Sequence, residues 1–132
     1  MTFMLDTNIC VFIMNEHPDV MEQFRKQRHY GVCISSIVLS ELEFGVYNSK
    51  YQQINRDKLN SLCALLAVLP IEISAAAEYG RIRADLTQRG RIIGALDMLI
   101  AAHAKSAGLT LVTNNTREFS RVIGLSIEDW LS

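Results

Sequence analysis

The chain has 132 residues, of which 49% are hydrophobic and 20% charged, and its formal net charge is −1. These values predict one compact domain over residues 1–132, and they exclude both intrinsic disorder and a strongly basic domain that binds nucleic acid through charge alone. The N-terminus has no signal-peptide pattern, no apolar run reaches membrane-spanning length and the three cysteines form no C-x-x-C pair, so we expect a cytoplasmic protein with reduced thiols.

The first half of the chain twice shows an apolar strand followed by a polar turn and a helix. Met1–Leu5 is followed by Asp6, Thr7 and Asn8, which favour turns and helix caps. Val32–Ile34 is followed by Ser35 and Ser36, and a helix is predicted over Ile37–Tyr47 with Glu41 in its middle.

The second half continues the alternation of helices and strands. The predicted elements are an amphipathic helix over 51–69 that Pro70 terminates, a brief strand at Ile71–Ile73, a helix capped by Ser74 that runs to Gln88, a helix over Ala95–Ser106, a strand at Leu109–Val112, a short helix over Thr116–Val122 and a last strand at Leu125–Ile127. The helix over Ala95–Ser106 is expected to face the core with Leu96, Leu99, Ile100 and Ala104.

This alternation predicts an α/β domain with a mostly parallel sheet and helices on both faces. Ligands of such sheets bind at the carboxyl ends of the strands, where Asp6, Ser35 and Thr113 are expected to lie along one edge. Acids from distant parts of the sequence would meet there, namely Asp6, Glu41 and Asp97, with Asn115 and Glu118 from the last polar turn. Clustered carboxylates repel one another, and oxygen ligands without Cys or His favour Mg²⁺ or Mn²⁺ and hydrolysis at phosphorus.

Each of these residues also has a purely structural interpretation. Asp6 can cap the first helix, and Asp97 can complement the dipole of its own helix. Glu41 lies beside apolar residues, yet Glu43 indicates that acids on this helix can face solvent. Asn115 and Glu118 suit a loop and the start of a short helix equally well, so no single residue decides the question.

Contact with RNA would need a local basic patch because the net charge is near zero. The candidates are Arg81, Arg83, Arg89, Arg91, Lys105, Arg117 and Arg121. A solvated helix face is the alternative interpretation of these residues.

Three segments resemble the signatures of PIN-domain proteins: MLDTN, ISSIVLSELEFG and GALDMLIAAHAKSAGLTLVTNNTREF. The last of these, with the EDW ending, resembles the VapC toxin branch, and the resemblance extends from Met1 to Trp130. It implies a three-layer α/β/α domain with four to five strands. It also implies that Asp6, Glu41 and Asp97 bind the metal, with Asn115 or Glu118 completing the site, and that Thr7, Asn8, Ser36 and Thr113 line the pocket. Arg91, from the candidate basic patch, is a predicted substrate contact. Relatives often carry proline where this chain has Ile92 and Ala95, which concerns the rigidity of that loop.

The resemblance further implies the toxin of a VapBC toxin–antitoxin pair. Such a toxin would be a Mg²⁺-dependent endoribonuclease, with Mn²⁺ able to substitute, that cuts RNA and so inhibits translation. The anticodon stem-loop of initiator tRNA is its expected target. The expected partners are a cognate VapB antitoxin, which inserts an Arg near the acids, and a second copy of the chain, within a larger hetero-oligomer.

Two other functions are alternatives to this one. A PIN-like module that only binds RNA or protein would be marked by a lost acid, whereas Asp6, Glu41 and Asp97 are all present. An aspartyl-phosphate phosphatase would need a second Asp at the position of Asn8.

Overall fold

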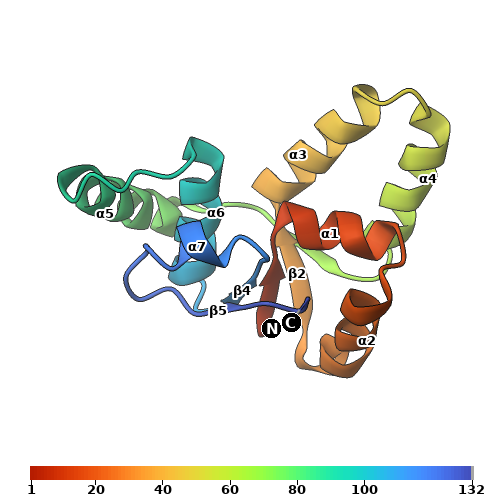
Figure 1. Cartoon of the computed structure of the whole chain (residues 1–132), viewed down its shortest axis with the longest axis horizontal. Helices are drawn as coiled ribbons and strands as arrows, with labels where there is room; N and C mark the ends of the chain where they lie inside the picture. The colour runs from red at the N-terminus through yellow and green to blue at the C-terminus, as the bar shows by residue number, and fades with distance from the viewer. Residues whose placement is uncertain (132) are drawn as a thin grey trace.

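A five-stranded parallel sheet forms the centre of the computed structural model, which describes residues 1–131 (Figure 1). Its strands are β1 (Phe3–Leu5), β2 (Val32–Ser35), β3 (Ala67–Leu69), β4 (Thr110–Val112) and β5 (Ile127–Glu128), in the order β3-β2-β1-β4-β5. All four strand pairs are parallel. The expected α/β class with a parallel sheet of four to five strands is therefore confirmed.

Helices flank this sheet on both sides. They are α1 (Thr7–Met14), α2 (Pro18–Gln27), α3 (Ser36–Tyr47), α4 (Gln52–Cys63), α5 (Ile73–Gln88), α6 (Ala95–Ser106) and α7 (Thr116–Phe119), with a 3₁₀ turn at Arg28–Tyr30. In Figure 1, α5, α6 and α7 lie on one side of the strands, and α1, α2 and α4 lie on the other. α3 leaves the end of β2 and packs against both α4 and α6.

The register of the strands aligns their carboxyl ends. Leu5 pairs with Val112, and the backbone N–H of Asp6 donates to the Val112 carbonyl at 2.8 Å. On the other side, Ser35 at the end of β2 pairs with Leu69. The polar turns after β1, β2 and β4 therefore lie along one edge of the sheet, as the sequence predicts.

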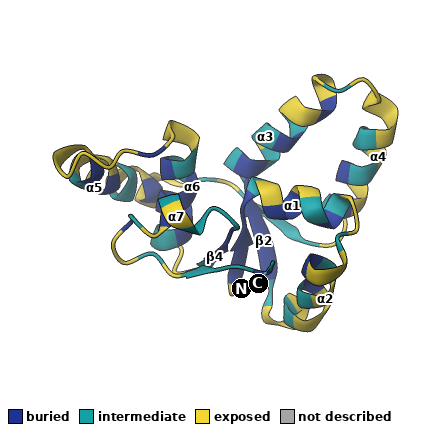
Figure 2. Ribbon diagram, viewed as in Figure 1, coloured by how far each residue is buried: buried dark blue, intermediate teal, exposed yellow. Residues whose placement is uncertain are grey.

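The three middle strands are buried, as Figure 2 shows by their dark colour. A strand with helices on both faces needs apolar side chains in both directions, and Met4, Leu5, Ile34 and Leu111 have no exposed surface. Among the helices that cover the sheet, α6 buries Met98 and every residue from Ile100 to Ala104. The edge of the sheet where the acids lie is therefore supported by buried strands and by the buried face of α6.

The structure corrects several sequence-based boundaries. The helix expected over 51–69 ends at Cys63, and the chain then forms β3 at Ala67–Leu69, so the strand predicted at Ile71–Ile73 is wrong. Pro70 does not terminate a helix but follows a strand that pairs with β2. The structure also contains α2, for which the sequence analysis gives no prediction, although its two buried residues, Val20 and Phe24, have the i, i+4 spacing of an amphipathic helix.

Smaller differences concern helix faces and ends. Leu96 is about half exposed, so the inward stripe of α6 begins at Met98 instead. α7 ends at Phe119 and not at Val122, and the last strand begins at Ile127. Among residues 1–131, no helix combines the length and the hydrophobicity that a membrane span requires.

Candidate active site

Asp6 lies at the carboxyl end of β1 and is 5% exposed. One carboxylate oxygen, Oδ1, accepts the backbone N–H of Thr7 at 2.8 Å, and the other, Oδ2, accepts the hydroxyl of Thr113 at 2.8 Å. Burial raises the pKa of Asp6, the bonds from Thr113 and Thr7 act in the opposite direction, and the nearby Glu41 raises the pKa further. Asp6 thus caps α1, as the structural interpretation proposed, and it also belongs to a cluster of acids.

Glu41 reaches the same edge from the middle of α3. Its Oε1 accepts the hydroxyl of Thr7 at 2.8 Å, so Thr7 contacts Asp6 through its backbone and Glu41 through its side chain. Ser35 begins α3 by accepting the N–H of Ile37 at 3.0 Å. Two capped helix starts therefore set the relative positions of these two carboxylates.

Asp97 lies in the first turn of α6, and its pKa is raised to about 6. Burial is the largest cause, followed by the charges of Asp6, Glu41 and Glu118. Carboxylates contributed by β1, α3, α6 and α7 are therefore close enough to repel one another. The structural interpretation of Asp97, as a residue that only complements the helix dipole, does not explain this repulsion.

The last polar turn is joined to Asp6 through Thr113, which is fully buried. The Thr113 hydroxyl donates to Asp6 and accepts the N–H of Asn115 at 2.9 Å. The side-chain amide of Asn115 donates to Oε2 of Glu118 at 3.2 Å. Glu118 therefore contributes the negative charge of this turn, and Asn115 orients it.

The other predicted pocket residues, Ser36, Asn8 and Arg91, form no hydrogen bond with these acids within residues 1–131. The hydroxyl of Ser36 accepts the N–H of Ile71 at 3.0 Å, which ties α3 to the segment between β3 and α5. Asn8 is exposed on α1. Arg91 is exposed in the segment between α5 and α6, where its backbone N–H donates to the Leu86 carbonyl.

Local ion pairs neutralise three of the seven residues of the predicted basic patch. Arg81 and Lys105 both contact Glu78, and Arg89 contacts Asp85 at 2.6 Å. Arg121 donates to the backbone carbonyl of Ile92. The three ion pairs agree with the interpretation as a solvated helix face for that part of the patch.

Sequence reasoning missed one polar contact near the site. His103, which is buried on α6, lies with its Nδ1 2.8 Å from the hydroxyl of Ser35. The sequence indicates Ser35 only as a helix cap, and nothing in the pattern of residues around His103 pairs it with a position 68 residues away.

The donor set fits a hard divalent cation. Every charged neighbour that shifts the pKa of Asp6 or Asp97 is a carboxylate, so a cation would relieve the repulsion, and all-oxygen ligands suit Mg²⁺ or Mn²⁺. Within residues 1–131, no three acidic, His or Cys side chains already stand in coordinating positions. Both oxygens of Asp6 are hydrogen-bonded, so metal binding would have to draw the acids together by small side-chain movements.

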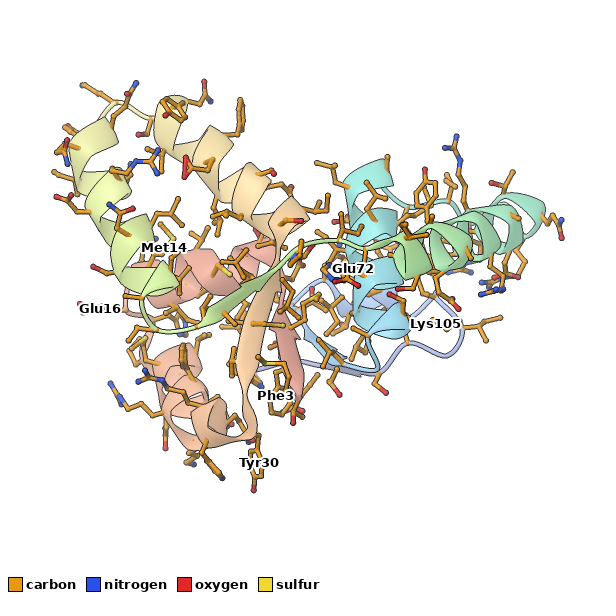
Figure 3. The ribbon with its side chains drawn as sticks, turned by 180° about the vertical axis from the view of Figure 1, so that it is seen from behind. Phe3, Met14, Glu16, Tyr30, Glu72 and Lys105 are labelled. Carbon is orange, nitrogen blue, oxygen red and sulfur yellow. The ribbon has the colours of Figure 1, made fainter. Side chains whose placement is uncertain are left out.

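A groove of about 320 Å³ begins at this site and runs between α1, α3 and α4. Thr7 and Glu41 line it from α1 and α3, and Asn55 and Lys58 line it from α4. Its apolar walls come from Val11, Met14, Leu42 and Val46, and Gly45 lines it without a side chain. Figure 3 labels Met14 near the end of α1 that faces α4.

Known proteins resemble this chain over almost its whole length. The ribonuclease VapC2 of Rickettsia felis is 43% identical over 134 residues, which cover 98% of each chain. The tRNA(fMet)-specific endonuclease VapC of Shigella flexneri is 46% identical over 129 residues, which cover 97% of each chain. A crystal structure of VapBC2 from Rickettsia felis, bound to a DNA fragment from their promoter, contains a chain that superposes with a TM-score of 0.94 at 42% identity, covering 98% of this chain and 99% of that one.

The family model of the PIN domain matches residues 3–125, which include β1, β4 and all the acids of the site. With this match and relatives above 40% identity, the chain belongs to the PIN-domain family and, within it, to the VapC ribonucleases.

Proposed function

We propose that this chain, with residues 1–132 as one PIN domain, is the toxin of a VapBC-type pair and hydrolyses RNA phosphodiester bonds with Mg²⁺. The observation that carries the proposal is the cluster of Asp6, Glu41, Asp97 and Glu118, in which mutual repulsion and burial raise the pKa of Asp97 to about 6. PIN-domain nucleases generally depend on a divalent metal. The names of the relatives support ribonuclease activity.

Asp6, Glu41 and Asp97 are the proposed metal ligands. When bound, a divalent cation supplies charge neutralisation at the phosphate and an activated water for attack on phosphorus. The residues of the chain hold the acids in place: Thr113 and Thr7 fix Asp6, and the Thr7 hydroxyl fixes Glu41. Preorganised side chains lower the reorganisation required during the reaction.

Glu118 is the proposed fourth acid, and Asn115 is its positioning residue. The carboxylate of Glu118 acts on the pKa of Asp97, whereas the Asn115 amide only donates to Glu118. Asn8 and Ser36 are proposed to line the pocket. Arg91, which is exposed six residues before Asp97, is proposed to contact an RNA phosphate.

The proposed substrate is the anticodon stem-loop of initiator tRNA. One relative at 46% identity is named for tRNA(fMet). A loop is physically suitable, because unpaired bases can be splayed out and recognised while the backbone enters the acidic edge. The proposed place of action is the cytoplasm, where the three free cysteines would remain reduced.

The proposed partner is a cognate VapB antitoxin, bound in the groove between α1, α3 and α4. The related structures are VapBC complexes, including that of Salmonella typhimurium at a TM-score of 0.93. An antitoxin segment with an apolar face would suit the walls of the groove, and an Arg on it would reach Glu41. A homodimer within a larger hetero-oligomer is part of the same proposal.

The test uses the purified chain freed of antitoxin and incubated with total bacterial tRNA in Mg²⁺, in Mn²⁺ and in EDTA, after which the product ends are mapped. Asp97→Asn is the test variant. The matched control is Asp19→Asn, which makes the same change in the first turn of α2. Discrete cuts that need metal, persist in Asp19→Asn and vanish in Asp97→Asn are expected. If the folded, metal-loaded wild type leaves tRNA intact, the substrate proposal fails, and if it also leaves other RNA intact, a binding module becomes the better interpretation.

A further inference from the structure

A buried hydrogen bond joins the two helices that carry Glu41 and Asp97. His103 on α6 is 4% exposed, and its Nδ1 lies 2.8 Å from Oγ of Ser35, which has no exposed surface. Ser35 ends β2 and caps α3. The bond therefore runs from the last turn of α6 to the residue that caps the start of α3.

The direction of this bond depends on the tautomer of His103. The Ser35 hydroxyl has one proton and two lone pairs, and one lone pair already accepts the N–H of Ile37. Burial lowers the pKa of His103, while Glu72, located where the chain passes from β3 to α5 (Figure 3), acts in the opposite direction. We assign the ring as neutral with its proton on Nε2, so that the Ser35 hydroxyl donates to Nδ1.

This bond and the two carboxylates of Glu41 and Asp97 lie on the same pair of helices, so the bond affects the geometry of the site. Asp97 lies six residues before His103 on the same helix, and Glu41 lies six residues after Ser35 along α3. Helices are stiff over such lengths, so a fixed Ser35–His103 contact also fixes how far apart the two carboxylates are held. Those carboxylates repel each other, which would otherwise favour a wider separation.

We propose that Ser35 and His103 are positioning residues whose hydrogen bond sets the separation of Glu41 and Asp97 and thereby the affinity for a divalent cation. This inference rests on the metal site of the proposed function. Neither residue would touch the metal or the RNA. Their effect would pass through α3 and α6.

A role confined to core stability is the alternative. Replacing both partners of a buried hydrogen bond with apolar groups of similar shape is often nearly neutral for stability. A pair that served only the core would thus be exchangeable for apolar residues with little effect on metal binding. The two roles therefore differ in what they predict for metal affinity at matched stability.

The experiment measures Mn²⁺ binding to the full antitoxin-free chain by isothermal titration calorimetry, with melting temperatures recorded alongside. The variants are His103→Leu, Ser35→Ala, the double variant, and His103→Asn, whose Oδ1 is attached to Cγ as Nδ1 is and can accept the Ser35 hydroxyl. The stability control is Val20→Ala, a buried change on α2 away from both helices.

We expect His103→Leu and Ser35→Ala each to weaken Mn²⁺ binding about tenfold, at the lower end of the range for residues that orient metal ligands. The double variant should bind no more weakly than the weaker single variant, and His103→Asn should recover most of the affinity. Val20→Ala should melt earlier yet bind Mn²⁺ as wild type does.

Wild-type affinity in His103→Leu and Ser35→Ala would overturn the inference and leave the metal site of the proposed function standing. Equal weakening in Val20→Ala would also overturn it, because affinity would then follow stability alone. Absence of Mn²⁺ binding by wild type would instead refute the metal site itself. If His103→Leu does not fold, Ser35→Ala and His103→Asn decide between these outcomes.

Discussion

Replacing Asp97 with Asn should stabilise the metal-free protein while abolishing its nuclease activity. The pKa of Asp97 is raised from 3.8 to about 6, which for a fully buried group corresponds to about 3 kcal/mol against the ionised form. Partial exposure of the side chain to solvent reduces this to about 1.5 kcal/mol. The lost interaction with the α6 dipole costs about 0.5 kcal/mol, so a net gain of about 1 kcal/mol remains.

The pH dependence has a definite sign. A carboxyl whose pKa is raised in the folded state destabilises that state only when it is ionised, so this penalty is small near pH 4 and complete above pH 6. For a chain of this size, about 1 kcal/mol corresponds to a rise in melting temperature of about 3–5 °C at pH 7.5. The gap between Asp97→Asn and wild type should shrink at pH 4.

The assay is thermal unfolding followed by circular dichroism in EDTA, at pH 7.5 and pH 4, and again at pH 7.5 with Mn²⁺. Metal at about a hundred times its dissociation constant should stabilise wild type by about 2.7 kcal/mol and the variant far less. Asp19→Asn, which removes an exposed acid from the first turn of another helix, should melt slightly earlier than wild type at pH 7.5. If Asp97→Asn melts at or below wild type in EDTA at pH 7.5, repulsion among the acids is refuted.

Two further changes test the supports of the site and the groove. Thr113→Val removes the hydroxyl that donates to Asp6, so tRNA cleavage at limiting Mg²⁺ should fall by about 10–100-fold. The control is Thr110→Val in β4, the strand just before Thr113, which should cleave tRNA normally. Similar cleavage rates for the two variants would argue against Thr113 as a support of Asp6. A Cβ at Gly45 would meet no atom within 4 Å, and Gly45 lines the open groove, so Gly45→Phe should fold and cut RNA but lose antitoxin binding in a pull-down or calorimetric titration. Gly80→Phe, equally unobstructed but on α5, is its control, and retained antitoxin binding by Gly45→Phe would place the antitoxin elsewhere.

The parallel α/β class and the edge where the acids meet could both be predicted from the sequence. Each of β1, β2 and β4 is a short apolar run followed by a polar turn. This pattern is local in the sequence and is typical of a buried strand, so it can be recognised without the tertiary structure. Parallel pairing then places Asp6, Ser35 and Thr113 side by side without further information. Asp97 and Glu41 follow from their positions in helices that the sequence also predicts well.

At the margin of the core, the conformation and burial of the chain depend on tertiary contacts. The strand β3 is three half-buried residues whose conformation depends on pairing with β2, so local periodicity extended the preceding helix through it. Helical spacing predicts that Leu96 faces the core, whereas it is 48% exposed and burial on α6 begins at Met98.

Within the site, the hydrogen bonds between polar groups could not be predicted, because they join segments that meet only in the folded chain. The contacts from Thr7 to Glu41, from Thr113 to Asp6 and from His103 to Ser35 span 34, 107 and 68 residues. Hydrogen bonds require heavy atoms within about 3 Å, and sequence spacing carries no information at that scale between segments so far apart. The same holds for the pKa of Asp97, since burial and three carboxylates from other elements raise it together.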